Sequence, residues 1–168
     1  KHRIPTTGFY FREKPKPRRL IKAILEQYDV PIKERVDITL GADFIKDDGS
    51  VISNKTLTKD PSLSLSYAYC SDTGYMPALA KRIEGCSLLY HESTFMEAEK
   101  ARAKKTMHST AAQAASIAKE AGVKHLLLGH YSARYTELDA LYQEALAVFP
   151  QTILGIQGLV IDIDKICS

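Results

Sequence analysis

Apolar and polar residues follow a regular pattern in the second part of the chain, from about residue 65 onward. Three short apolar runs predict strands, at about 65–70, 86–91 and 124–130. Four segments with apolar residues at helical spacing predict helices, at about 76–83, 97–105, 109–121 and 136–148. Strands that are apolar on both faces and alternate with helices are typical of a largely parallel sheet in an α/β protein.

Local signals predict where two of these helices begin or end. Thr110 and Gln113 match a capping box, and Gly122 supplies the stop of the same helix. Thr136 is the expected N-cap of the last helix. An apolar run at 159–163 predicts a final strand.

The first part of the chain has a weaker pattern. Residues 1–13 alternate in a way that predicts a strand, and the prolines of the following KPKPRR make a stiff break. Apolar residues at i, i+3, i+4 and i+7 predict a helix from Arg18 to Tyr28. Residues 30–64 are expected to hold short strands and a loop.

The composition is that of an ordinary globular domain. Hydrophobic residues make up 45% of the 168 and charged residues 26%, and a net charge of +3 does not by itself imply a polyanionic partner. No apolar run approaches the roughly 20 residues of a membrane span, so no membrane contact is expected. The three cysteines lack C-x-x-C spacing, and we expect reduced thiols in a cytoplasmic protein. The chain starts at Lys1, and we expect this start to be a cut in a longer protein.

Polar residues follow each of the three predicted strands. Asp72 follows the first strand, Glu92 the second and His130 the third, and His108 comes just before the start of a helix. The carboxyl ends of parallel strands meet at one edge, so these groups are expected to converge. Imidazole and carboxylate are the ligands of catalytic zinc or manganese. Free backbone N–H groups at the helix start beside His108 suit an anionic phosphate.

Each of these residues also has an ordinary structural explanation. A single aspartate after a strand often caps a turn, and a lone histidine at a strand end is more often a hydrogen-bonded structural residue. His125, at the start of a strand, is predicted to have no role in a site. The prediction of a site therefore depends on four groups meeting at one edge of the sheet.

Longer strings are more specific. YCSDTGY, then LLYHESTF, then MHSTAAQAASIAKEAGVKHLLLGHYSARY occur in this order. They resemble the C-terminal motifs of ribonuclease Z, the metallo-β-lactamase-superfamily endonuclease that trims the 3′ side of precursor tRNA. The opening KHRIPTTGFYF also resembles the metal-histidine segment of that family. The resemblance covers essentially the whole chain, most strongly residues 65–150.

This resemblance implies a fold and partners. Residues 1–168 would be the C-terminal half of the enzyme, with a basic arm-like insertion at about 14–44. The fold would be half of a metallo-β-lactamase-type αββα sandwich, a mixed sheet with flanking helices. One apolar sheet face would then be bare, and the missing N-terminal half or a second copy would cover it. The family also implies a homodimer and a precursor tRNA substrate.

The resemblance also implies roles for individual residues. His2 and His130 would be ligands to different ions of a two-zinc site, bridged by Asp72, although other divalent metals are possible. His108 and Glu92 would be the catalytic pair: His108 assists departure of the 3′ oxygen and Glu92 orients it. The family's His-x-His-x-Asp-His segment is absent. The chain alone is therefore expected to lack tight zinc binding and catalysis.

The start of the chain is rich in cations. Between Lys1 and Lys22 there are eight basic residues and one acidic residue. A charge run is usually a solvated helix face, but contact with RNA phosphates is the alternative that the family favours, for Arg18, Arg19 and Lys22.

Two other functions stay open. One is a phosphodiesterase of the same fold that acts on a small phosphodiester. The other is an inactive fragment that acts as a binding or assembly module, which the missing metal motif favours.

Overall fold

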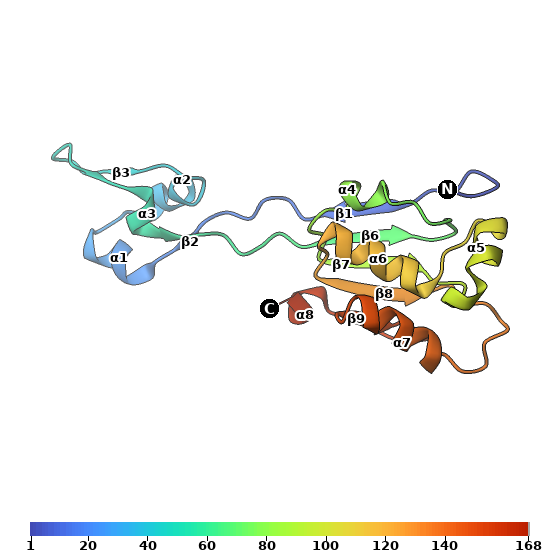
Figure 1. Ribbon diagram of the computed structural model, residues 1–168. Coiled ribbons are helices and arrows are strands. Elements are labelled where there is room, and N and C mark those ends of the chain that lie inside the picture. The colour runs from blue at the N-terminus through green and yellow to red at the C-terminus, as the bar shows by residue number, and fades with distance from the viewer. Residues whose placement is uncertain (168) are drawn as a thin grey trace. The chain divides into compact units, whose positions relative to one another are not determined.

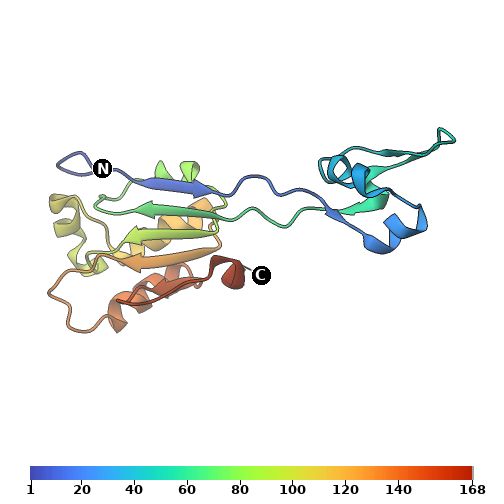
Figure 2. The same cartoon turned by 180° about the vertical axis from the view of Figure 1, so that it is seen from behind.

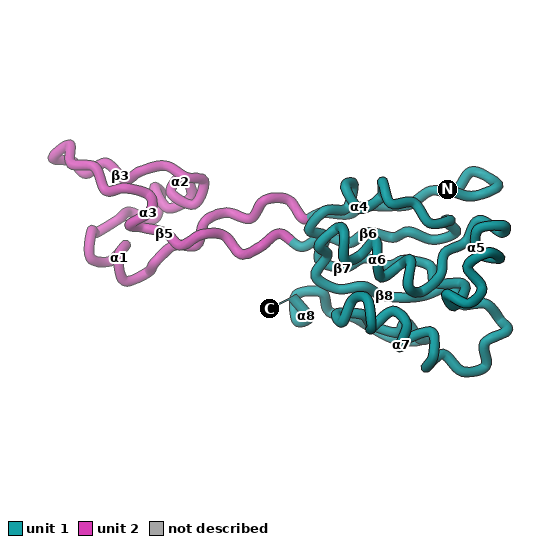
Figure 3. The backbone as a smooth tube through the Cα atoms, viewed as in Figure 1, with its two compact units in different colours: residues 1–12, 65–168 teal, residues 13–64 magenta. Residues whose placement is uncertain are grey.

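The computed structural model describes residues 1–167, which form two compact units (Figure 3). Unit 1 comprises residues 1–12 and the chain from Leu65 onward, and unit 2 comprises Glu13–Ser64. The insertion expected at about 14–44 lies within unit 2, which continues to Ser64. Unit 2 extends beyond the expected insertion because its first strand, Arg19–Leu20, pairs with the strand Thr58–Lys59 near the end of the unit.

Unit 1 is built on one five-stranded mixed sheet, seen in Figures 1 and 2. Its strands in spatial order are β1 (Phe9–Arg12), β6 (Ser66–Cys70), β7 (Leu88–Glu92), β8 (His125–Gly129) and β9 (Thr152–Leu154). β1 runs antiparallel to β6, and the other neighbours are parallel. The three strands predicted from apolar runs are β6, β7 and β8, and the predicted α/β sheet with flanking helices is confirmed.

Helices cover one face of this sheet. Figure 1 shows that face, with α4 (Leu79–Arg82), α6 (Ala111–Ala121) and α7 (Asp139–Val148) packed on it, and Figure 2 shows the other face. A short 3₁₀ helix, η2 (Glu97–Glu99), leads into α5 (Lys100–Thr106). Among residues 1–167, no helix combines the length and apolar character that a bilayer span requires.

The core of unit 1 lies between α6 and the sheet. Leu89 of β7 pairs in register with Ala68 of β6 and Leu126 of β8, and all three are fully buried. The buried side of α6 is mostly alanine, so its backbone can approach the strands closely. The predicted capping box is confirmed, since Thr110 accepts from the Gln113 N–H and Gln113 accepts from the Thr110 N–H.

The end of the chain differs from the sequence prediction. The last predicted helix begins at Asp139, and Leu138 rather than Thr136 occupies its N-cap position. The strand predicted at 159–163 is wrong: β9 lies at Thr152–Leu154, and helix α8 spans Ile163–Cys167. Several side chains of this apolar run instead line a groove on the open face of the sheet, together with Tyr90 and Leu127.

That open face carries aromatic side chains. Phe9 stacks on Phe11 with ring centroids 6.2 Å apart, Phe11 stacks on Tyr67 at 6.3 Å, and Tyr69 stacks on Tyr90 at 4.7 Å. Phe9 and Phe11 are both more than half exposed. The predicted bare apolar face therefore exists in the described structure.

Unit 2 has a small core of its own. Its elements are β2 (Arg19–Leu20), α1 (Lys22–Gln27), η1 (Ile32–Glu34), α2 (Arg35–Thr39), β3 (Phe44–Ile45), β4 (Val51–Ile52), α3 (Asn54–Leu57) and β5 (Thr58–Lys59). Five apolar side chains are buried together, namely Leu25, Val30, Ile38, Phe44 and Leu57. The helix predicted from Arg18 is shorter than expected because Arg19–Leu20 pair with Thr58–Lys59 as strands.

Candidate metal and active site

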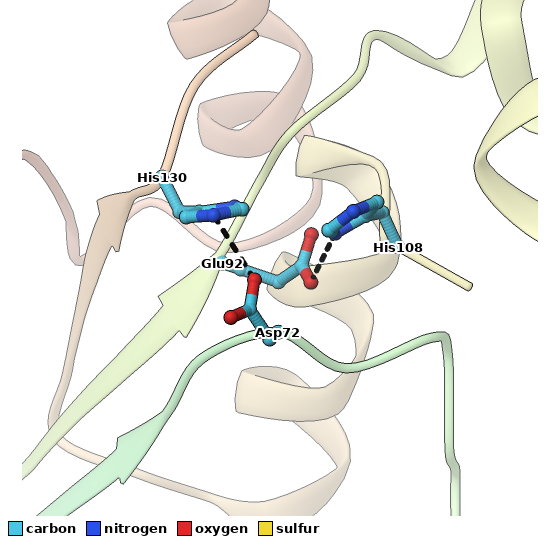
Figure 4. Close-up of side chains that lie close together, drawn as sticks. All are labelled: Asp72, Glu92, His108 and His130. Carbon is cyan, nitrogen blue, oxygen red and sulfur yellow. Dashed lines mark hydrogen bonds and ion pairs between the residues drawn. The ribbon is translucent and has the colours of Figure 1, made fainter. Parts of the chain in front are cut away.

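The predicted site residues of the sheet meet at one edge. Asp72, Glu92 and His130 lie at or just after the carboxyl ends of the parallel strands β6, β7 and β8, and His108 comes from the turn between α5 and α6. Figure 4 shows the four side chains converging. One ligand atom from each lies within 4.8 Å of the others.

Left-handed backbone conformations place three residues of this region. Asp72 has φ 49° and His130 has φ 58°, so the chain turns sharply as it leaves each strand. Met107 ends α5 with φ 60°, and the N–H of the following His108 returns to the Ala103 carbonyl at 2.9 Å. Such conformations are costly for residues other than glycine and cluster at functional sites.

Glu92 is a wholly buried carboxylate with a complete set of donors. Its Oε1 accepts from the Thr73 N–H at 2.6 Å and lies 2.8 Å from His108 Nδ1. Its Oε2 accepts from the Thr94 hydroxyl at 2.6 Å and from the Ser109 N–H at 3.0 Å. Four donors offset the cost of burying this charge, so Glu92 is fixed in place.

The anion site expected at the start of α6 is therefore wrong in one respect. The Ser109 N–H is bound to Glu92, and the Thr110 N–H is bound to the side chain of Gln113. The Ala111 N–H donates to the Phe95 carbonyl at 2.9 Å. The protein's own carboxylate and amide occupy the place that a phosphate was expected to take.

Three imidazoles are oriented in the same way. Nδ1 of His2 lies 3.0 Å from the Met107 carbonyl oxygen, and Nδ1 of His130 lies 2.9 Å from the Thr94 hydroxyl oxygen. Nδ1 of His108 faces Glu92. A hydrogen bond from Nδ1 leaves Nε2 of the ring for a metal or a substrate, as is usual for ligating histidines.

The accessible part of the site is a histidine–aspartate pair. Nε2 of His130 lies 3.0 Å from Oδ1 of Asp72, and both side chains are about half exposed. The His108 ring lies between the other two imidazoles, with centroids 5.1 Å from His2 and 5.3 Å from His130. The structure thus brings together four of the five residues that the sequence analysis placed in the site, and the fifth, His2, borders this cluster through the ring of His108.

The donor set of the described residues suits a divalent metal but does not complete a site for two zinc ions. His2, Asp72 and His130 offer nitrogen and oxygen atoms, whereas both oxygens of Glu92 and Nδ1 of His108 are already engaged. Zinc takes three or four protein ligands per ion. Two ions would therefore need ligands from outside the described residues.

Thr94 is a site residue that the sequence reasoning missed. Its hydroxyl oxygen lies 2.6 Å from Glu92 Oε2, 2.9 Å from His130 Nδ1 and 3.4 Å from His108 Nδ1. The available signal was its position two residues after Glu92 at the end of an apolar strand.

The side chains of two other histidines, His91 and His125, lie outside this cluster. His91 is fully buried on the core side of β7, its Nδ1 lies 2.7 Å from the Glu92 carbonyl oxygen, and burial lowers its pKa. His125 begins β8, at the opposite end of the strands from Glu92, and its Nδ1 lies 3.9 Å from the sulfur of Cys167.

The predicted RNA-contacting cations lie in unit 2, where each has a partner. Arg18 pairs with Asp60 at 2.8 Å and also donates to the Thr58 hydroxyl. Arg19 donates to the Asp60 carbonyl at 3.0 Å. Lys22 is largely exposed, with Glu26 3.7 Å away.

Comparisons with known proteins agree with this fold. The family model for the beta-lactamase superfamily domain matches residues 62–131, which contain Asp72, Glu92, His108 and His130. The crystal structure of the metallo-beta-lactamase fold protein YhfI from Bacillus subtilis superposes with a TM-score of 0.54 at 28% identity, covering 58% of this chain and 40% of that one. A long form RNase Z from yeast gives a TM-score of 0.56 at 23% identity over 64% of this chain and 15% of that one. The chain thus has the metallo-β-lactamase fold.

Sequence relatives are more specific. Ribonuclease Z of Bacteroides thetaiotaomicron is 48% identical over 98% of this chain and 52% of its own length. Ribonuclease Z of Parabacteroides distasonis is 50% identical over 95% of this chain and 52% of its own length. The resemblance to ribonuclease Z is confirmed: the chain is homologous to that enzyme, and it spans about half the length of these relatives.

Proposed function

We propose that this chain is the C-terminal part of a zinc-dependent ribonuclease Z that cleaves the 3′ trailer from precursor tRNA. The observation that carries the proposal is the pair formed by buried Glu92 and His108 beside the exposed Asp72 and His130. The homology to ribonuclease Z supports the substrate class.

His2, Asp72 and His130 would hold two metal ions together with ligands from the rest of the enzyme. The carboxylate of Asp72 and the Nε2 atoms of the two histidines would be the ligand atoms from this chain. Zinc is the expected metal, although other divalent ions are possible, and when bound it activates water and neutralises phosphate charge. Thr94 and the Met107 carbonyl orient the two ligand imidazoles.

His108 would act on the leaving group. Its Nδ1 is held by Glu92 and its Nε2 is left for the substrate, so in the imidazolium form Nε2 would give its proton to the 3′ oxygen as the bond from phosphorus to that oxygen breaks. The oxygen of the attacking water forms the new bond to phosphorus, and the proton that this water gives up restores the one that His108 donated. The products are a 3′ hydroxyl on the tRNA and a 5′ phosphate on the trailer.

The chain would work with the N-terminal half of the same enzyme. That half would supply the missing ligands and cover the open aromatic face of the sheet, whose groove of about 530 Å³ is lined by residues such as Tyr67, Tyr90 and Leu127. Two copies of the complete enzyme would form a homodimer in the cytoplasm.

Unit 2 would contact the RNA. Lys22 presents its ammonium group to solvent, and Arg19 donates to a backbone carbonyl rather than to a carboxylate. Phosphate contacts of this kind strengthen binding without reading sequence.

The test is a cleavage assay on precursor tRNA, using this chain joined with the N-terminal half of a ribonuclease Z, hereafter the complete enzyme. We expect cutting that leaves a 3′ hydroxyl, and loss of that cutting in His108→Ala. Cleavage of bis(p-nitrophenyl) phosphate without cleavage of precursor tRNA would favour a phosphodiesterase with a small substrate. RNA binding without any cleavage would favour a binding module.

A further inference from the structure

A cavity of about 500 Å³ has His108 in its wall. This volume falls within the roughly 300–1,000 Å³ of small-ligand pockets. Three segments supply the other lining residues that matter here, namely Gly74 and Tyr75 after β6, Lys100 and Lys104 on α5, and Gln113 on α6. The metal-site residues Asp72 and His130 do not line it.

The cationic part of the wall comes from α5. Lys100 and Lys104 are one helical turn apart, so both face the cavity. Lys100 is held by Glu97, with its Nζ 2.6 Å from the carboxylate. The ion pairs formed by residues 1–167 do not include Lys104. Of the two lysines of α5, Lys104 is thus the better placed to meet a phosphate, and Lys1 also lines the cavity.

Another part of the wall is aromatic. Tyr75 is 39% exposed and follows Gly74. A Cβ on Gly74 would lie 3.5 Å from the Met107 backbone, so this loop is packed closely beside the end of α5. The side-chain oxygen of Gln113 accepts a hydrogen bond from the Thr110 N–H, so the orientation of its amide group is fixed. An aromatic ring can stack on a base, an amide can form hydrogen bonds with it, and an ammonium group can pair with a phosphate. These three groups together therefore suit a nucleotide.

We propose that this cavity is the subsite for the nucleotide whose 3′ oxygen leaves in the reaction. This inference rests on the proposed function, because it takes His108 as the group that protonates that oxygen. The ribose that carries the oxygen must lie within hydrogen-bond reach of His108. Its base then stacks on Tyr75, and the phosphate on its 5′ side meets Lys104.

The first test measures binding to the chain itself. Amide spectra of the ¹⁵N-labelled protein are followed while adenosine 5′-monophosphate is added, with inorganic phosphate and adenosine as separate probes. We expect shifts at Gly74, Tyr75 and Gln113, and a loss of affinity of about fivefold or more in Tyr75→Ala but not in Tyr75→Phe. Lys104→Ala is expected to weaken binding of the nucleotide and of phosphate, whereas Lys105→Ala, one residue on and outside the cavity lining, is the matched control.

Shifts confined to unit 2, or equal affinities for Tyr75→Ala and the parent, would overturn the subsite. A dispersed amide spectrum of each variant shows that it is folded.

The second test uses the complete enzyme and a precursor tRNA with an abasic site on one side of the cut. An abasic site on the 5′ side is expected to lower kcat/KM for the parent, with no further loss in Tyr75→Ala. An abasic site on the 3′ side is expected to act independently of Tyr75. If the abasic site on the 5′ side and Tyr75→Ala lower kcat/KM independently of each other, the subsite is refuted. Cleavage of the precursor tRNA by the complete enzyme would still uphold the proposed function. Nucleotide binding in the cavity without any tRNA cleavage would refute the proposed function alone.

Discussion

Nδ1 of His108 lies 2.8 Å from Oε1 of Glu92, and the Glu92 side chain has no exposed surface. The imidazole is therefore anchored to a group that cannot itself reach a substrate. This arrangement makes Glu92 a positioning residue and leaves Nε2 of His108 as the reactive atom.

Replacing Glu92 by glutamine removes the carboxylate but keeps the shape of the side chain. The amide of Glu92→Gln has one oxygen for four donors, so we expect kcat of the complete enzyme to fall about 10²–10⁴-fold with a smaller change in KM. The unfolding free energy should fall by about 1–3 kcal/mol because a buried donor loses its acceptor. The measurements are steady-state kinetics and urea unfolding, with His125→Gln as the control. An unchanged kcat would contradict the positioning role.

Thr94 offers a test of how the metal ligand His130 is oriented. In Thr94→Val the shape is kept but the oxygen 2.9 Å from His130 Nδ1 is removed. Loss of such a partner typically lowers metal affinity about 10–100-fold. Competition with a chelator on the complete enzyme measures this effect, and Thr94→Ser should retain most of the affinity. Equal affinity of the valine and serine variants would mean that the hydroxyl does not orient the ligand.

The three cysteines should differ in reactivity. Burial raises the pKa of Cys70 to about 11, with a smaller contribution from Cys86, and burial also raises the pKa of Cys86. Only the thiolate reacts, so both thiols should resist alkylation at pH 8 in the native protein. Cys167 is partly exposed and should be modified first. Mass spectrometry after a short iodoacetamide pulse tests this order, and early labelling of Cys70 would contradict it.

Unit 2 gives a prediction about salt dependence. Neutralising Arg18, Arg19 and Lys22 in the complete enzyme should raise the Kd for precursor tRNA. The slope of log K against log salt should flatten by about 0.9 for each phosphate that the variant no longer neutralises. Lys22→Ala is the single substitution that should disturb the structure of unit 2 least, because Arg18 also pairs with Asp60 within that unit. Filter binding at several salt concentrations measures the slope, and a slope unchanged in the triple variant would refute the RNA contact.

The sheet and α6 could be predicted because local and global signals agree there. The runs around Leu89 and Leu126 are apolar on both faces, and Thr110 with Gln113 marks a helix start that needs no tertiary context. The strand predicted at 159–163 was wrong because an apolar run can either join the edge of a sheet or pack on its face. Here it packs on the open face of the sheet rather than joining its edge.

That these residues converge at one edge of the sheet could be predicted from the sequence, but their hydrogen bonds could not. Strand ends pointed to Asp72, Glu92 and His130. The hydroxyl of Thr94 acquires its role only from contacts with groups up to 36 residues away. Unit 2 was harder still, because the helices described in it have no more than six residues and its core is assembled from separated side chains.

The most direct test of a metal site divided between two halves of the enzyme is the zinc content and precursor tRNA cleavage of the purified chain, before and after mixing with the N-terminal half of a ribonuclease Z. We predict that tight zinc binding and cleavage appear only on mixing, because His2, Asp72 and His130 supply part of the ligand set. Tight zinc binding and cleavage by the chain alone would contradict it, since ligands within this chain would then complete the site.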